Sequence, residues 1–342
     1  MFANILLKWF QENGRDLPWR QTRDPYAIWL SEIILQQTQV KQGWEYWERF
    51  MRRWPTVEAL AAATEDEVLR EWQGLGYYSR ARNLHYAARQ IVEQGSFPNT
   101  IEGIKQLKGV GDYTAAAIGS IAFNLPAAVV DGNVYRVLSR YFGIDTPINT
   151  TEGKKLFATL AQDQLLPALN REGMGAGLYN QSIMDFGAIQ CTHQSPKCDA
   201  CPLMESCSAF RTGRIQELPV KLKTLKIRER HLIYLYLRCQ GQTAIHRRGA
   251  GDIWQGLYEP WLTDEVPNGA VLLRQNVKHV LTHRVLYADF YLLEVSEKPS
   301  LPADYIWIPE SDIDKYALPR LIEILLDSVQ TMAQFYQTKS KF

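Results

Sequence analysis

Cysteine is scarce in this sequence of 342 residues. Only five are present, four of them between Cys191 and Cys207 and the fifth at Cys239, which excludes a disulfide framework distributed over the chain. A secretory layout is also lacking at the amino terminus, because Lys8 and Trp9 interrupt its apolar stretch. We therefore expect a cytoplasmic protein without a targeting signal, whose thiols are kept reduced and are available to bind metal.

Long hydrophobic runs are lacking as well. The longest candidate, residues 115–130, is interrupted by Ser120, Asn124 and Pro126, so it predicts a buried helix and a turn rather than a membrane span. The net charge is only +1, which neither requires nor excludes nucleic acid. Between residues 211 and 230, however, seven basic residues stand against two acidic ones. We interpret this segment as a solvated linker, with a linker that faces phosphate as the alternative.

The length is sufficient for two domains, and the residue pattern changes near residue 208. Helical periodicity before that point gives way to β-branched and aromatic runs after it. We predict helices at residues 58–63, 67–72, 80–93 and 154–162, strands at 231–239, 287–295 and 305–308, and a closing helix at 317–332. The chain is therefore expected to be multidomain, with an all-α region over residues 1–208, a basic linker over 209–228 and an α+β domain over 229–342.

The four clustered cysteines have a fixed spacing. Six residues separate Cys191 from Cys198, two separate Cys198 from Cys201, and five separate Cys201 from Cys207. The polar, turn-forming segment 192–197 lets the sulfurs converge, and thiolate ligands at this density select zinc or an iron–sulfur cluster. A pair of disulfides is the alternative. The spacing by itself leaves the choice between the two metals open.

Residues 107–118 predict a tight turn between two helices. Gly109 and Gly111 permit the turn and let backbone N–H groups approach an anion, and a helix rich in small residues begins directly afterwards. Lys108 lies in the same turn. Farther along the chain, Asp131 follows an apolar stretch and precedes Gly132, as a helix N-cap does. The run over about residues 99–122 resembles a helix-hairpin-helix, which grips DNA phosphates without reading sequence.

The hairpin, Asp131 and the cysteine quartet together are similar to the base excision DNA glycosylases of the endonuclease III superfamily. The segments Leu17-Pro18-Trp19-Arg20 and 29–40 (WLSEIILQQTQV) resemble the signature of the adenine DNA glycosylase (MutY) family, and residues 74–84 match it too. That family removes adenine mispaired with 8-oxoguanine. The resemblance is dense over residues 5–210 and looser to the end of the chain. It favours a 4Fe-4S cluster in the loop 191–207.

The resemblance makes Glu32 the acid that protonates adenine. If residues 26–39 are helical, its neighbours Ile28, Trp29 and Leu35 are apolar and raise its pKa. Asp131 becomes the second carboxylate, ionised and facing the deoxyribose, with Asn133 orienting the site. Tyr113 stands where lyase members of the superfamily carry a lysine. Because a phenol cannot form a Schiff base, we expect a monofunctional enzyme that leaves the strand intact.

The resemblance also assigns residues that surround the flipped nucleotide. Gln37 and Tyr77 fill the gap in the stack, and Leu75 and Thr38 lie beside the opposite base. The adenine pocket would be formed by Arg15, Trp19, Arg20 and Gln181. The expected partner is double-stranded DNA that contains A:8-oxoguanine or A:G mispairs, bound by a monomer associated with a bacterial nucleoid, without any membrane partner.

Residues 229–342 resemble the Nudix-like carboxy-terminal domain of the same family. The glutamate-rich helix that holds magnesium in a Nudix hydrolase is missing after residues 256–260, so we expect a recognition domain without pyrophosphatase activity. A Phe-Ser-His loop contacts the oxidised guanine in the family, and this chain has Leu281-Thr282-His283 instead. Thr282 keeps a hydroxyl, whereas Leu281 lacks the aromatic ring of the phenylalanine in the family. This loss of the ring affects the contacts that would distinguish 8-oxoguanine from guanine.

Two other functions remain open. A thymine or pyrimidine mismatch glycosylase could use the same scaffold, although Glu32 in its glutamine-rich motif and the long carboxy-terminal domain argue against it. A non-catalytic protein that scans DNA with a redox-responsive cluster would bind mismatched duplexes and release no base.

Overall fold

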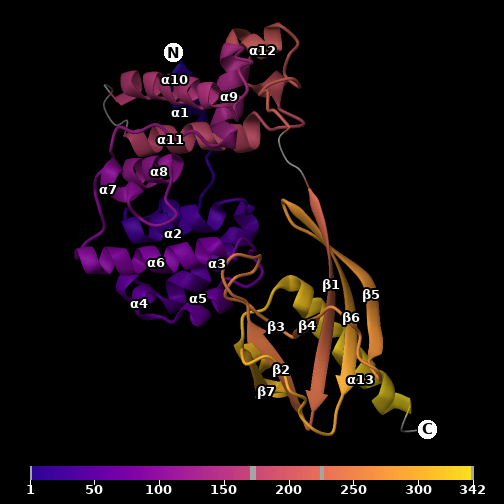
Figure 1. Ribbon diagram of the computed structural model, residues 1–342. Coiled ribbons are helices and arrows are strands. Elements are labelled where there is room, and N and C mark those ends of the chain that lie inside the picture. Colours follow the sequence, from indigo (N-terminus) through magenta and orange to yellow (C-terminus); the bar gives the residue numbers. More distant parts are fainter. Residues whose placement is uncertain (1, 170–174, 224–226, 340–342) are drawn as a thin grey trace. The chain divides into compact units, whose positions relative to one another are not determined.

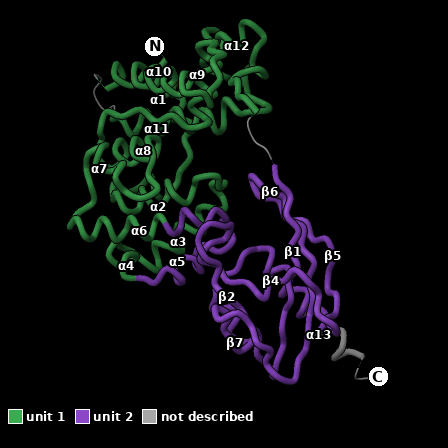
Figure 2. Tube along the Cα trace, in the orientation of Figure 1, with its two compact units in different colours: residues 1–62, 83–223 green, residues 63–82, 224–342 purple. Residues whose placement is uncertain are grey.

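The computed structural model describes residues 2–169, 175–223 and 227–339; residues 224–226 of the predicted linker lie outside the described residues. The chain divides into two compact units (Figures 1 and 2). Unit 1 comprises residues 1–62 and 83–223, and unit 2 comprises residues 63–82 and 224–342. Within the described ranges, no helix is both long and apolar enough to cross a membrane.

Unit 1 is helical (Figure 1). Its α-helices are α1 (Phe2–Asn13), α2 (Pro25–Leu35), α3 (Val40–Arg53), α4 (Val57–Ala62), α6 (Ser79–Gln94, whose first residues belong to unit 2), α7 (Ile101–Lys105), α8 (Asp112–Phe123), α9 (Gly132–Phe142), α10 (Thr151–Leu169), α11 (Ala176–Asp185) and α12 (Ser208–Arg211). Shorter helical turns are η1 (Pro18–Arg20), the π-helical turn η2 (Phe186–Gln190), η3 (Cys198–Ala200) and η4 (Met204–Ser206).

Helix α2 lies at the centre of unit 1. The Asp24 side chain caps its first turn by accepting from the Tyr26 backbone N–H at 3.0 Å, and Pro25 occupies the first helical position. Every residue from Tyr26 to Ile34 is buried, and Glu32 is the one charged residue in this largely apolar run. The helix ends at Leu35 because Gln37 adopts a left-handed backbone conformation, with φ of 56°. The expected helix over residues 26–39 is therefore too long.

Small residues bring the neighbouring helices of unit 1 close together. Helix α8 packs against α2 and α11, with Ala115, Ala117 and Gly119 buried, and a Cβ atom on Gly177 of α11 would lie 2.7 Å from the Ser120 carbonyl oxygen of α8. Asn124 ends α8 with φ of 55°, and its side chain accepts from the first N–H of α11 at 2.9 Å. These contacts fix the three helices that form the candidate site.

Unit 2 contains a mixed seven-stranded sheet. The strand order is β3-β2-β1-β6-β5, with β4 paired to β1 and β7 paired to β2. Strands β1 and β6 are parallel, whereas the other pairs are antiparallel. Its elements are α5 (Glu65–Glu71), β1 (Arg228–Cys239), β2 (Gln242–Arg247), β3 (Tyr258–Glu259), β4 (Trp261–Thr263), β5 (Val271–Val280), β6 (Arg284–Glu294), β7 (Tyr305–Pro309), η5 (Glu310–Lys315) and α13 (Arg320–Lys339).

The core of unit 2 lies between the sheet and α13. Tyr234 of β1 and Phe290 of β6 are fully buried against Leu321 and Leu325 of α13. Alternate residues of β6 point to this side, as the pattern of a sheet with one face covered requires. An all-α region followed by an α+β domain is thus confirmed, and the predicted helices and strands are present with ends that differ by up to seven residues.

Residues 63–82 group with the carboxy-terminal residues, a division that the sequence did not predict. Arg247 of β2 forms ion pairs with Glu65 at 2.8 Å and Asp66 at 2.9 Å. Arg82 donates to the Gln255 carbonyl at 2.6 Å. The Gln73 side chain also donates to Glu323 of α13. Because these pairs join segments far apart in the chain, no local sequence pattern predicts them.

The predicted linker is shorter than expected. Residues 209–223 belong to unit 1, and Ser208–Arg211 forms α12. Ala209 and Leu218 are buried, and the Ile148 N–H donates to the Val220 carbonyl at 3.0 Å. The basic residues of this segment are therefore carried on a folded extension of unit 1, whose apolar positions anchor it.

Candidate active site

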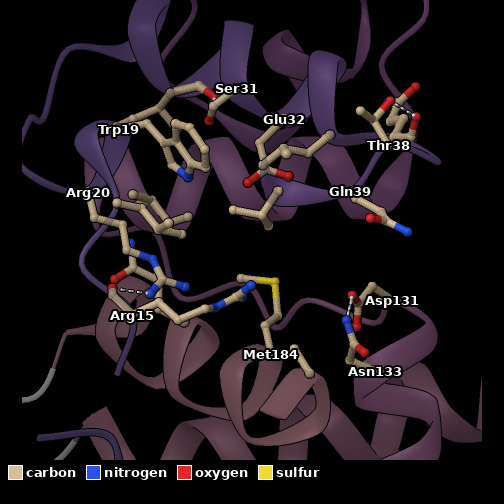
Figure 3. Close-up of a pocket in the computed structure, with 18 of the residues that line it drawn as sticks. Arg15, Trp19, Arg20, Ser31, Glu32, Thr38, Gln39, Asp131, Asn133 and Met184 are labelled. Carbon is tan, nitrogen blue, oxygen red and sulfur yellow. Dashed lines mark hydrogen bonds between the residues drawn. The ribbon is translucent and has the colours of Figure 1, made fainter. Parts of the chain in front are cut away.

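A pocket of about 600 Å³ opens in unit 1 between α2, α8, α11 and the start of α9 (Figure 3). This volume is in the range of small-molecule sites in proteins. Ten predicted site residues line it: Arg15, Trp19, Arg20, Glu32, Gln37, Thr38, Tyr113, Asp131, Asn133 and Gln181. The structure thus brings the expected acid, the expected second carboxylate and the expected base-binding residues into one cavity.

Glu32 projects into the pocket from α2 (Figure 3). The residue is only 9% exposed, and its carboxylate accepts a hydrogen bond of 2.9 Å from the Tyr113 hydroxyl. Burial raises the pKa of Glu32 to about 7, against an opposing effect of the Tyr113 hydrogen bond; the charge of Asp131 raises it further and that of Arg20 lowers it. A carboxyl with this pKa holds a transferable proton near neutral pH.

Tyr113 lies on the first turn of α8, which packs against α2, and its hydroxyl reaches Glu32. Burial, followed by the charges of Glu32 and Asp131, raises the pKa of the Tyr113 phenol well above its ordinary value. The phenol is therefore neutral and acts as a hydrogen-bond donor. Its oxygen also lies 3.6 Å from the Met184 sulfur, which places the side chain between the acid and α11.

Asp131 caps α9 and also faces the pocket. Its carboxylate accepts from the Val134 backbone N–H at 2.7 Å and from the Asn133 side-chain amide at 2.9 Å. Burial raises the pKa of Asp131, and these two hydrogen bonds oppose the rise. The N-cap role and the pocket role therefore coexist, because one carboxylate serves both. Figure 3 shows Asp131 and Asn133 across the cavity from Glu32.

Arg136 connects Asn133 to the cysteine segment. Its guanidinium donates to the Asn133 side-chain oxygen at 2.7 Å, to the Gly187 carbonyl at 2.6 Å and to the Cys191 carbonyl at 2.7 Å. A Cβ atom on Gly187 would lie 2.6 Å from the Asn133 Cβ, so this position requires glycine. The amide that orients Asp131 is thus itself held by a residue bound to the cysteine loop.

Arg15 and Arg20 line the pocket but are tied to a residue that the sequence analysis missed. Both guanidinium groups donate to Asp185, the last residue of α11, whose side chain is fully buried. Trp19 is nearly buried beside them, and its ring packs edge-on against Trp44 and Trp47. A charged residue inside the apolar run Ile183 to Phe186 was the available signal, because an isolated charge there requires a partner.

The pocket contains further polar and sulfur groups without an expected role. Ser31, Gln36, Gln39 and Met184 line it. Gln36 and Gln39 flank the predicted Gln37 and Thr38 and are brought in by the sharp end of α2. The resemblance assigned no role to these four residues, so the sequence analysis did not include them among the site residues.

The four cysteines line a second cavity of about 30 Å³ in unit 1. Burial, with contributions from the neighbouring thiolates, raises the pKa of Cys198 and Cys207 and raises that of Cys201 to about 11. Burial therefore disfavours free thiolates here, and the ionised form that binds metal would need a cation to stabilise it. Among the described residues, no group of three or more His, Cys, Asp and Glu side chains is arranged to hold a single metal ion. The all-thiolate donor set fits an iron–sulfur cluster.

Arg140 braces the cysteine segment. The residue is buried on α9, and its guanidinium donates to the carbonyls of Thr192 at 2.6 Å and His193 at 2.9 Å and lies 3.5 Å from the Cys191 sulfur. It also donates to the carbonyls of Ile215 and Leu218, each at 3.0 Å. One side chain therefore fixes both the loop 191–207 and the segment that follows it.

The hairpin residues lie outside the pocket. Lys108, Gly109 and Gly111 are exposed in the turn between α7 and α8. Gly109 has φ of 80°, and a Cβ atom there would lie 2.8 Å from Asn83, so glycine is required. Gly111 is extended with open space around it. Its lack of a side chain leaves the backbone N–H groups at the start of α8 approachable.

The remaining predicted residues lie in unit 2. Tyr77 is 46% exposed with φ of 46°, and its hydroxyl forms a hydrogen bond with the Thr282 hydroxyl. Thr282 and His283 are exposed in the turn between β5 and β6, whereas Leu75 is buried. The structure therefore brings Tyr77, which was expected to fill the gap in the stack, together with Thr282 of the loop expected to contact the oxidised guanine. It keeps the Leu75 side chain covered.

Comparisons with known proteins agree with this architecture. The model of the HhH-GPD superfamily of base excision DNA repair proteins matches residues 30–162, and a NUDIX domain model matches residues 233–328. The solved structure of a thermostable thymine-DNA glycosylase is similar with a TM-score of 0.56 and 32% sequence identity, covering 62% of this chain and 95% of that one. Unit 1 thus has the fold of a helix-hairpin-helix base excision repair protein.

Two curated relatives identify the family within this class of base excision repair proteins. The adenine DNA glycosylase of Buchnera aphidicola subsp. Baizongia pistaciae is 32% identical over 310 residues, which cover 84% of this chain and 85% of that protein. The adenine DNA glycosylase of Rattus norvegicus is 43% identical over 232 residues, which cover 64% of this chain but only 44% of the rat protein. The chain therefore belongs to the adenine DNA glycosylase family.

Proposed function

We propose that this chain is a monofunctional DNA glycosylase that excises adenine mispaired with 8-oxoguanine or guanine, in base excision repair. The observation that carries the proposal is the buried Glu32 carboxyl, with its pKa near 7, opposite Asp131 in a pocket large enough for a nucleobase. The names of the curated relatives support adenine as the base. The target nucleotide would be extruded from the duplex into this pocket.

Glu32 is the proton donor in the proposed reaction. Unprotonated adenine is a poor leaving group, so its imidazole nitrogen takes the Glu32 proton while the bond from the sugar C1′ to the base breaks and its electron pair passes to the base. The Tyr113 hydroxyl, bonded to the same carboxylate, then stabilises the ionised form of Glu32. General acids of this kind typically contribute about 10²- to 10⁴-fold to the rate.

Asp131 stabilises the positive charge that the departing base leaves on the sugar. Its carboxylate is oriented by Asn133 and by the Val134 N–H, so it is fixed before the charge develops. A water then adds its oxygen to C1′, and the proton that it releases restores the carboxyl of Glu32. The products are free adenine and an abasic site in an unbroken strand, because Tyr113 offers no amine for a Schiff base.

The remaining residues divide into those that bind the base and those that bind the duplex. Arg15, Trp19, Arg20 and Gln181 surround the extruded adenine, and Gln37 and Thr38 flank the gap. Lys108 and the backbone at Gly109 and Gly111 bind phosphate. In unit 2, Tyr77 fills the gap in the stack, and Thr282 and His283 lie beside the opposite base, for which the hydrogen bond between Tyr77 and Thr282 gives support. Leu75, assigned to the opposite base by the resemblance, has a buried side chain.

We also propose that Cys191, Cys198, Cys201 and Cys207 hold a 4Fe-4S cluster. Bound there, the cluster would supply cohesion to the loop 191–207 rather than chemistry in the adenine pocket. Elemental analysis of purified protein, together with its visible absorption, tests this assignment. Iron with broad visible absorption is expected, and stoichiometric zinc in its place would contradict it.

A thymine mismatch glycosylase is the second candidate, because the solved thymine-DNA glycosylase shares the fold of unit 1. Thymine carries no imidazole nitrogen to protonate, so a buried acid at Glu32 would have no obvious partner in that reaction. Purified protein should be incubated with A:8-oxoguanine, A:G and T:G duplexes and the products treated with alkali, which cuts abasic sites. Cleavage of the first two supports our proposal, whereas cleavage of T:G alone supports the second candidate and no cleavage at all supports a binding protein.

A further inference from the structure

Asp185 lies behind the pocket wall. It accepts several hydrogen bonds, although no sequence motif assigns it a role. Its fully buried carboxylate accepts from the Arg15 backbone N–H at 2.9 Å, from Arg15 Nε at 3.0 Å and from Arg15 Nη2. It also accepts from both terminal nitrogens of Arg20, at 2.8 and 2.7 Å. A carboxylate removed from water is stable only when it is paired and hydrogen-bonded to this extent.

These bonds hold a segment that has little regular structure of its own. Between α1 and α2 the chain forms only the short turn η1, residues 18–20. Asp185 anchors this segment to the end of α11, and Arg20 Nη1 reinforces it by donating to the Arg15 carbonyl at 2.8 Å. The side chains of Arg15 and Arg20 remain 29% and 12% exposed on the pocket side. They are thus presented to the cavity from a fixed backbone.

The contacts of Asp185 with Arg15 and Arg20 also determine the net charge beside Glu32. The charged or titratable groups that face Glu32 are Tyr113 from α8, Asp131 at the start of α9 and Arg20 from η1. Of these, Arg20 lowers the pKa of Glu32. Burial acts to raise the pKa of Asp185, but the hydrogen bonds from Arg20 and Arg15 outweigh burial and lower it, so Asp185 stays ionised and offsets one of the two arginine charges.

We propose that Asp185 is a positioning residue of this pocket, which fixes Arg15 and Arg20 against its wall and cancels one of their two charges next to Glu32. Without Asp185, the uncompensated arginine charge favours the ionised form of Glu32, and the proton needed for base excision is lost at a lower pH. The inference deepens the proposed function, on which its catalytic meaning rests, but the ionisation of Glu32 can be measured without any substrate.

The test compares Asp185→Asn with the parent protein, each with and without Glu32→Gln. The difference in unfolding free energy between the Glu32 and Glu32→Gln forms, followed against pH, reports where Glu32 ionises. We expect Asp185→Asn to lower this midpoint by on the order of one pH unit, because one buried charge is removed from a poorly solvated site. Asp163→Asn, at an exposed position of α10, is the matched control and should leave the midpoint unchanged.

Two further variants separate charge from packing. Adding Arg15→Gln to Asp185→Asn removes the excess charge and should return the midpoint toward that of the parent. Arg20→Gln alone should move the midpoint upward, and it carries the test if Asp185→Asn does not fold. A midpoint that stays the same in both Asp185→Asn and Arg20→Gln overturns the inference. If the midpoints shift as expected but the parent releases no adenine, the proposed function fails while the role of Asp185 stands.

Discussion

Replacement of Glu32 by glutamine should stabilise the protein in a strongly pH-dependent way. The pKa of this carboxyl is about 7 in the folded protein, against an ordinary value of 4.5. At about 1.36 kcal/mol per pH unit, ionisation of Glu32 within the folded state therefore costs on the order of 3 kcal/mol. The main cause is burial on α2, where nearly every neighbouring residue is also buried.

The direction in which the stability changes with pH follows from proton linkage. Because the folded state binds the Glu32 proton more tightly than the unfolded state does, the free energy of unfolding contributed by Glu32 is fully present below about pH 4.5 and falls as the pH rises. The loss is complete above about pH 7. Glutamine has no proton to lose and can still accept the Tyr113 hydrogen bond through its amide oxygen. The stabilisation by Glu32→Gln should thus grow between these two pH values and then level off.

Denaturant unfolding of the parent and of Glu32→Gln, at a series of pH values from about 4.5 to 8, measures this difference. Glu12→Gln, at an exposed position of α1, is the control for a change of charge alone. A difference that stays flat over this range would refute the reasoning, because it would mean that Glu32 ionises as an ordinary solvated carboxyl. The same variant should bind duplexes containing adenine mispairs and release no adenine; near-normal release would place the acid elsewhere.

Three further outcomes are expected. Tyr113→Lys should yield an enzyme–DNA adduct that borohydride traps, because its amine would lie beside the sugar; denaturing electrophoresis detects the adduct. Arg136→Gln should slow adenine release roughly 10- to 100-fold in single-turnover assays, because Asn133 loses the group that orients it. Phe290→Ala should lower the unfolding free energy of unit 2 by about 3–5 kcal/mol, because the ring is fully buried; urea unfolding measures this loss.

For each of these three predictions, one result would contradict it. Absence of trapping in active Tyr113→Lys protein would move residue 113 away from the sugar. An unchanged rate in Arg136→Gln would mean that Asn133 is held well enough by its remaining neighbours. A loss below about 1 kcal/mol in Phe290→Ala would show that the packing between β6 and α13 is looser than the burial of this ring implies.

The sequence predicted which residues line the pocket better than it predicted where their helices end. The resemblance to the glycosylase family named Glu32, Tyr113 and Asp131 as one group, and the structure places all three in the pocket lining. The end of α2 was misplaced because the left-handed conformation of Gln37 breaks a run whose residues would otherwise continue a helix. Asp185 was missed because its partners Arg15 and Arg20 lie about 170 and 165 residues away in the chain.

The division into two units likewise depends on contacts between distant residues, which sequence patterns do not reveal. Helical periodicity correctly predicted a helix near residues 67–72, but periodicity carries no information on which core receives a helix. That depends on ion pairs such as Arg247 with Glu65 and Asp66, which join segments about 180 residues apart in the chain. In the same way, the buried Leu218 anchors a segment whose charge alone suggested a solvated linker.

Membership of residues 63–82 in unit 2 has a topological consequence. The polypeptide passes between the units after residues 62, 82 and 223, so the two units are interleaved in the chain rather than arranged in series. Proteolytic cleavage at the last of these crossings would leave a nicked protein, in which the carboxy-terminal fragment stays attached through its own contacts with residues 63–82. Removal of that fragment would instead strip the Tyr77 loop of its supporting surface, so the shortened chain would be an altered protein and not an isolated domain.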